Sequence, residues 1–201
     1  MADRYEYYNT GDGSGAVMYA QYWAAQTFTP SAAHIITSVK LKLYRFGSPG
    51  TLTISIRATS EGKPTGNDLA TGTTNGNNLP VSSPYEWREI ALGNGCELSS
   101  GIEYAIVVRA LNGSGFENAK WRLDNSSPTY ASGTYTYSNN SGSSWSVTAG
   151  SDFLFEDWGT GFPISNTINY KWHVKALVND TPQLIWNVRK LVDKAIQFKW
   201  D

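Results

Sequence analysis

Cysteine and histidine are almost missing from this sequence. Among its 201 residues there is one cysteine, Cys96, so no disulfide can form within the chain. The two histidines, His34 and His173, are far apart in the sequence, and Cys96 is the single cysteine. A structural zinc site needs closely spaced Cys and His ligands, so the sequence excludes such a site. We therefore expect no metal and no cofactor. Cys96 is expected to be a free thiol, and each histidine a strand or surface residue.

Charge is also scarce, and its two signs nearly cancel. Lys, Arg, Asp and Glu together make up 16% of the chain, and the net charge at pH 7 is −1. Bulk electrostatics therefore recruits neither nucleic acid nor an anionic membrane as a partner. No apolar run approaches the roughly 20 residues of a membrane span, and the first six residues lack an apolar signal core. We expect a chain that is made in the cytoplasm.

Sequence motifs of catalysis are missing as well. The many serines include no G-x-S-x-G nucleophile elbow. Two carboxylate pairs occur, Glu86/Glu89 and Glu156/Asp157, but nothing in their spacing places them across a groove as glycoside hydrolysis requires. The sequence therefore predicts a protein that is not an enzyme.

Aromatic residues and glycine, by contrast, are abundant. Aromatics make up 13% of the chain, and 19 glycines lie among many Ser, Thr and Asn residues, a profile typical of all-β proteins with many turns. Apolar and polar residues alternate over residues 39–43 and 52–58, on either side of a Gly/Pro turn at 47–50, which predicts a β-hairpin. Residues 104–110 are apolar on both faces and predict a central strand. Further short strands are expected at residues 26–28, 87–92, 121–123, 134–137, 145–147 and 153–158, and loops at 61–68 and 71–84.

About eight or nine such strands without a long helix predict two packed antiparallel sheets. The expected fold class is all-β, an antiparallel β-sandwich of jelly-roll type with a C-terminal β-repeat extension. The expected parts are a flexible N-terminal arm (1–16), the jelly-roll sandwich (17–158), a linker (159–169) and a repeat tail (170–201).

The tail repeats itself with a period of 14 residues. Trp172-His173-Val174 is echoed by Trp186-Asn187-Val188, and a third copy begins at Trp200. Repeated units bury their apolar face against stacked neighbours. Strands and a coiled coil are both compatible with this period, but Pro182 and the Trp, Val and Ile content favour strands. We expect the tail to assemble a homo-oligomer, such as a trimer, through Trp172, Val174, Leu177, Trp186, Val188, Leu191 and Trp200.

The body resembles the choice-of-anchor type R family and related jelly-roll modules of phage and bacterial surface proteins. The segments that carry this resemblance are Gln26-Thr27-Phe28-Thr29-Pro30, Ile36-Thr37-Ser38-Val39-Lys40-Leu41, Gly62-Lys63-Pro64-Thr65-Gly66 and residues 101–108. The tail is similar to tandem Trp-Asn-Val repeats of predicted phage structural proteins. The resemblance implies a fold and a place on a surface, but no catalytic residues. The leading hypothesis is a virion structural protein, a capsid decoration or tail fibre component, that assembles with itself and with other virion proteins.

Two smaller features concern turns and sugars. Residues 138–145 are similar to an Asp-box, a hairpin turn, with Ser138, Asn140, Gly142 and Trp145 at its key positions.

The alternative hypothesis is an extracellular or cell-surface carbohydrate-binding module. Its candidate sugar-binding residues are Trp121, Asp124, Tyr130, Tyr135 and Tyr137.

Overall fold

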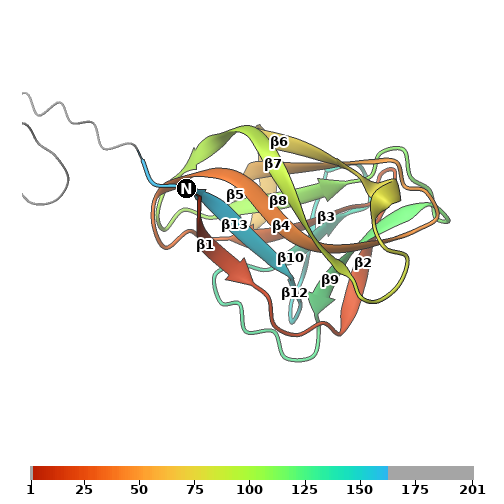
Figure 1. Ribbon diagram of the computed structural model, residues 1–201. Coiled ribbons are helices and arrows are strands. Elements are labelled where there is room, and N and C mark those ends of the chain that lie inside the picture. The colour runs from red at the N-terminus through yellow and green to blue at the C-terminus, as the bar shows by residue number, and fades with distance from the viewer. Residues whose placement is uncertain (1, 163–201) are drawn as a thin grey trace, which may run out of the picture. The chain divides into compact units, whose positions relative to one another are not determined.

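The computed structural model describes residues 2–162, and these form an all-β fold of two antiparallel sheets (Figure 1). The first sheet contains β1 (Asp3–Tyr8), β2 (Ser14–Met18), β4 (His34–Phe46), β7 (Glu86–Leu98), β9 (Asn118–Asp124), β12 (Asp152–Phe153) and β13 (Phe155–Thr160). The second contains β3 (Trp23–Phe28), β5 (Thr51–Ser60), β6 (Lys63–Asn75), β8 (Tyr104–Arg109), β10 (Tyr135–Ser138) and β11 (Ser146–Thr148). A short 3-10 turn, Gly76–Asn78, follows β6. The expected all-β class and sandwich-like arrangement are confirmed.

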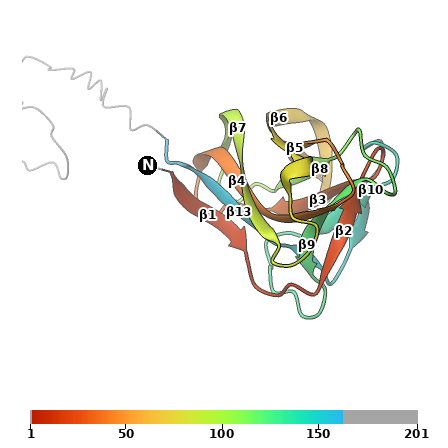
Figure 2. The same cartoon turned by 45° about the vertical axis from the view of Figure 1, so that its right-hand side comes forward.

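The long strand β4 organises the first sheet. One of its edges pairs with β13 over residues 35–41 and with β9 over residues 43–46, while its other edge pairs with β7. β4 thus changes partner along its length, and the sheet that it organises curls into a half-barrel (Figure 2). The second sheet has the simple order β11-β10-β3-β8-β5-β6.

The core fills the space between the sheets. Alternate residues of β4 and β5 point into it, so that Leu41, Leu43, Ile54 and Ile56 are fully buried. Each such side chain contributes roughly 1.5–3 kcal/mol by leaving water. The predicted central strand is confirmed, because every residue of β8 is buried between β3 and β5.

The predicted hairpin across residues 47–50 is wrong, although both of its strands exist. β4 belongs to the first sheet and β5 to the second, so the turn carries the chain from one sheet to the other. β5 instead forms its hairpin with β6. The two strands that flank this turn, β4 and β5, each direct an apolar face into the same core. Their alternation of apolar and polar residues would be the same if they paired within one sheet or lay in two sheets that face each other.

The loop predicted at 61–68 is largely wrong, whereas the loop predicted at 71–84 exists but begins only at residue 76, after β6 ends. The turn after β5 consists of Glu61 and Gly62, which both have positive φ, and β6 then runs for 13 residues. As the edge strand of its sheet, β6 leaves most of its residues exposed or half-exposed. It therefore needs little apolar alternation, and the sequence shows none. The segment 153–158 is likewise divided, since β12 ends at Phe153 and β13 begins at Phe155.

The expected flexible arm is instead part of the first sheet. β1 pairs with β13, and β2 pairs with β9. Between them, the carboxylate of Asp12 lies 2.7 Å from Lys42 Nζ and accepts a hydrogen bond from Arg122 Nε. These contacts explain why a Gly-rich segment is held in one place.

The expected linker also begins inside the sheet. Gly159 and Thr160 pair with Ile36 and Ile35 of β4. The rest of the linker from residue 163, and the repeat tail with its seven predicted assembly residues, lie outside the described residues.

Candidate functional site

Trp121 and Asp124 cannot act as the sugar-binding residues that the sequence predicts, because both are buried. Trp121 is fully buried, stacks on Phe153 at a ring-centroid distance of 4.1 Å and donates its indole N–H to the Leu154 carbonyl at 2.8 Å. It is a core residue, with its one polar atom satisfied inside the protein.

Asp124 instead holds a turn together. Its carboxylate accepts hydrogen bonds from the Ser126 backbone N–H at 2.9 Å and from the Tyr8 hydroxyl at 2.8 Å. These hydrogen bonds, led by that of the Ser126 N–H, lower the pKa of Asp124 to about 2. The carboxylate thus fixes the segment after β9 to β1 and is not free to bind a ligand.

The three predicted tyrosines do not form a common exposed surface. Tyr130 and Tyr135 pack half-buried against the core, Tyr135 with its ring centroid 4.6 Å from that of Phe153. Burial is also the main reason why the pKa of Tyr130 is raised. Only Tyr137, with 40% of its surface exposed, presents its ring to solvent. The structure therefore does not bring the five predicted residues together.

Residues 138–145 form a tight turn between β10 and β11. The Ser138 hydroxyl accepts the Gly142 N–H at 2.8 Å, and the Asn140 side-chain oxygen accepts the Ser144 N–H at 2.9 Å. Gly142 has a φ of +80°, and a Cβ atom there would come within 2.6 Å of the Trp23 ring. Trp145 follows the turn and packs with Trp23 over the outer face of the second sheet.

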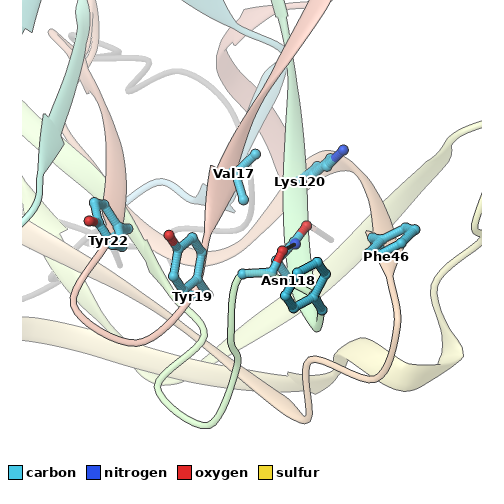
Figure 3. Close-up of a pocket in the computed structure, with 8 residues that line it drawn as sticks. Val17, Tyr19, Tyr22, Phe46, Asn118 and Lys120 are labelled. Atoms are coloured by element: carbon cyan, nitrogen blue, oxygen red, sulfur yellow. Dashed lines mark hydrogen bonds between the residues drawn. The ribbon is translucent and has the colours of Figure 1, made fainter.

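An open groove lies on the outer face of the first sheet, and its residues differ from those that the sequence predicts. Its volume is about 650 Å³. Register places Val17 opposite Lys120, Lys120 opposite Tyr44, and Asn118 opposite Phe46. Figure 3 shows Tyr19 and Tyr22 toward one end, Phe46 toward the other and Asn118 between them. The groove is lined by Val17, Tyr19, Tyr22, Phe46, Gly115, Phe116, Asn118 and Lys120.

Aromatic rings stand exposed around this groove. The exposed fraction is 82% for Phe116, 55% for Phe46 and 37% for Tyr22. Backbone hydrogen bonds between Tyr19 and Tyr22 close a tight turn that sets their ring centroids 4.6 Å apart. Such clusters of exposed apolar side chains mark interaction sites more often than isolated ones do.

Two polar side chains complete the groove. Asn118 is 4% exposed and donates its amide N–H to the Gly115 carbonyl at 2.9 Å, while its buried Oδ1 accepts no hydrogen bond from the described residues. Lys120 Nζ lies 5.3 Å from the centroid of the Tyr44 ring and has no carboxylate within ion-pair distance in the described part of the chain. Asn118 therefore forms part of the floor of the groove, and Lys120 gives the groove an unpaired cation beside aromatic rings.

The sequence contains a weak signal for these residues. Phe46 and Phe116 each adjoin a glycine, and the two tyrosines flank the dipeptide Ala20-Gln21. Aromatic residues in turns are poorly placed to enter a core, which makes them candidates for exposure. What a sequence does not show is that β2, β4 and β9 carry these turns to one place.

Away from the groove, the structure contains a pair of titratable groups that is closed to solvent. His34 and Asp157 are both fully buried, with His34 Nε2 2.9 Å from Asp157 Oδ2 and His34 Nδ1 2.9 Å from the Ala32 carbonyl. Tyr5 stacks on the imidazole at 3.8 Å between ring centroids. Burial alone would lower the pKa of His34, but the hydrogen bonds to Asp157 and Ala32 outweigh it and raise the pKa. Both ring nitrogens face oxygen atoms, so His34 links β4 to Asp157 of β13. It lies in a strand as expected, but it is buried.

Within residues 2–162, no group of three or more His, Cys, Asp and Glu side chains is placed to hold a metal ion. The same residues contain no helix that is both long and apolar enough to cross a membrane. Comparison of the sequence with models of known protein families finds no match, and neither does comparison with curated proteins.

Proposed function

We propose that this protein is a non-enzymatic surface module that binds carbohydrate in the groove on its first sheet. The observation that carries the proposal is the set of exposed rings of Tyr22, Phe46 and Phe116 in one groove that Lys120 also lines. A sugar ring has apolar C–H faces that stack on aromatic rings and a rim of hydroxyl groups that donate and accept hydrogen bonds. The exposed rings supply the stacking surface, and the Lys120 ammonium supplies a hydrogen-bond donor.

The shape of the groove also suits a glycan. It is open to solvent and is bordered by short turns, so a chain of sugars could pass through without threading. The resemblance of the body to jelly-roll modules of phage and bacterial surface proteins supports this role. In the proposal, the two sheets are a variant of that jelly roll, and the protein works on the surface of a virion or a cell.

A pair of aromatic variants tests the proposal. Phe116→Ala removes an exposed groove ring, and Tyr137→Ala removes a ring of similar kind on the second sheet. We expect the wild-type chain to be retained on an array of immobilised oligosaccharides, with retention lost in Phe116→Ala and kept in Tyr137→Ala. Retention that depends on Tyr137 and not on Phe116 would move the site to the second sheet. No retention of the wild type on any sugar would refute carbohydrate binding.

A second candidate function is assembly through the C-terminal repeat, and the 14-residue period with Trp172, Trp186 and Trp200 favours it. In this proposal the protein is a capsid decoration or tail fibre component of a phage virion, made in the host cytoplasm. Its partners are further copies of itself and other virion proteins. The tail would join subunits.

Solution mass tests the assembly proposal. Light scattering should give a trimer or a larger oligomer for the full chain and a monomer for a chain that ends at Phe162, just after β13. A monomer in both cases would refute assembly through the tail. An unchanged oligomer after truncation would place the subunit contact on the sandwich.

A further inference from the structure

We infer that the groove selects carbohydrates that carry a carboxylate group, and that Lys120 binds this group. The inference rests on the proposed function, since it names the class of sugar that the same groove would take. It comes from an imbalance of charge on the outer face of the first sheet, at the groove and beside it.

Three cations lie near one another on this face. Lys42 comes from β4, and Lys120 and Arg122 come from β9, two residues apart and therefore on the same side of the strand. The carboxylate of Asp12 forms ion pairs with two of them, Lys42 and Arg122. Lys120 is left as the cation with no carboxylate partner among the described residues.

This local excess of positive charge contrasts with the net negative charge of the body as a whole. Residues 1–158 contain 10 Lys and Arg against 14 Asp and Glu, which gives 10 − 14 = −4. Glu117 is near in sequence, but its side chain lies beside Gly47 on the neighbouring turn and forms no ion pair with Lys120. An unpaired cation on a body of negative charge makes the groove the part of this face best suited to an anion.

The position of Lys120 ties the cation to the groove. Its ammonium group lies over the Tyr44 ring, a contact that favours a defined position for a flexible side chain. Lys120 lines the groove together with the exposed rings of Phe46 and Phe116. A sugar that stacks on these rings could therefore also reach the Lys120 ammonium.

The matched probes are oligogalacturonates and their methyl esters, together with sialylated glycans and the same glycans without sialic acid. Within each pair, the charge of the carboxylate is present in one member and lost in the other. We expect the full-length protein to bind the acidic member about tenfold more tightly, as for a charge-assisted hydrogen bond at a partly exposed site. Raising the salt concentration should reduce this preference.

Two variants at one position identify the residue. Lys120→Gln removes the charge and should abolish the preference for the acidic member, so that the ratio of the two affinities falls to about one. Lys120→Arg keeps the charge and should preserve the preference. Circular dichroism confirms that both variants are folded.

The outcomes separate this inference from the proposed function. Equal binding of acidic and neutral members by the wild type, or an acidic preference that survives in Lys120→Gln, would overturn the inference and leave carbohydrate binding in place. Binding of neither member, or binding that is unchanged in Phe116→Ala, would overturn the proposed function and the inference with it.

Discussion

Two aromatic clusters lie on the outer faces of the two sheets, and they differ in what covers them. On the second sheet, the tryptophan cluster of Trp23 and Trp145 packs over Ala25, Ala105 and Val107, and Trp145 is only 8% exposed. On the first sheet, the groove rings stand open, with Phe116 82% exposed. Composition is similar in the two places, so aromatic content alone does not identify a binding site.

Charge pairing shows the same difference. Beside the tryptophan cluster, the guanidinium of Arg109 lies 5.2 Å from the Trp23 ring centroid, and Arg57 and Arg109 each bind the Asp68 carboxylate at 2.7 Å. In the groove, Lys120 has no such partner among the described residues. A cluster whose rings are buried and whose charges are paired stabilises the fold. A cluster whose rings are exposed and whose cation is unpaired is available to a ligand.

The largest expected effect comes from truncating one ring in each cluster. Trp145→Ala should lower the free energy of unfolding by about 3 kcal/mol, because it removes buried area over Ala25 and Val107. Phe116→Ala should change it by less than about 0.5 kcal/mol, since the ring is already in water. Urea unfolding of the two variants measures the difference. Equal losses would mean that the groove rings are structural too.

Removing the shared carboxylate of the tryptophan cluster should have the next largest effect. Asp68→Asn leaves Arg57 and Arg109 without their anion, and we expect a loss of about 2 kcal/mol, less than the roughly 3–5 kcal/mol of a fully buried pair. Glu89→Gln is the control, because its ion pair with Lys40 is more exposed and should contribute little.

The same carboxylate predicts a pH dependence. Burial would raise the pKa of Asp68, but the hydrogen bonds from Arg109 and Arg57 outweigh it and lower the pKa. The pair therefore stabilises the protein above the pKa of an unfolded aspartate, about 3.9, and this contribution disappears as the pH falls through the lower folded-state pKa. In acid, wild type and Asp68→Asn should converge in stability. A constant gap between them down to pH 2 would contradict this.

The contribution of His34 to stability depends on pH with the sign opposite to that of Asp68. His34 lies in a third environment, which is neither open to solvent nor lined by tryptophan. Its raised pKa means that its contribution is complete below the pKa of an unfolded histidine, about 6.5, and is lost as the pH rises through the folded-state pKa. Tyr5 stacks on the ring, Asp157 binds it, and the charge of Glu6 also favours its protonated form. Burial raises the pKa of Asp157, and it raises the pKa of the nearby Cys96 thiol to about 11, so that thiol stays neutral over this range.

An NMR titration of His34 in His173→Gln, which leaves one histidine, measures this directly. We expect a titration midpoint above that of a model peptide and a modest decline in unfolding free energy through the same pH range. Binding of neutral sugars to the groove should not follow this titration. A midpoint below 6.5 would show that burial outweighs the hydrogen bonds.

The smallest of these effects should come from replacing Trp145 by phenylalanine. Trp145 Nε1 has no acceptor in the described residues, so Trp145→Phe loses no hydrogen bond and should cost only about 1 kcal/mol, for the part of the ring system that it removes. Trp121→Phe also removes the indole hydrogen bond to the Leu154 carbonyl, which keeps only the longer hydrogen bond from the Lys42 N–H at 3.4 Å, and should cost about 1 kcal/mol more. Thermal unfolding of both variants compares them, and equal costs would indicate that Trp145 Nε1 has a partner.

Local patterns predicted many strands but not all of their partners. The alternation over residues 39–43 and 52–58 depends only on which residues face a core, and both segments are strands as expected. The pairing of β5 with β6 was missed, because β6 is a polar edge strand without alternation. The placing of β1 and β2 was missed for a related reason, since contacts such as Asp12 with Lys42 join residues distant in the sequence.

The candidate site shows the same division between the sequence and the tertiary structure. By itself, the sequence determined an all-β chain with more aromatic residues than a core of this size can use, because composition and period-two patterning act within a few residues. Only the tertiary structure decided which aromatics were left over. It buried Trp121 and set Tyr22, Phe46 and Phe116 around one groove. Exposure depends on which strands become neighbours, and that depends on how the two sheets close around their core.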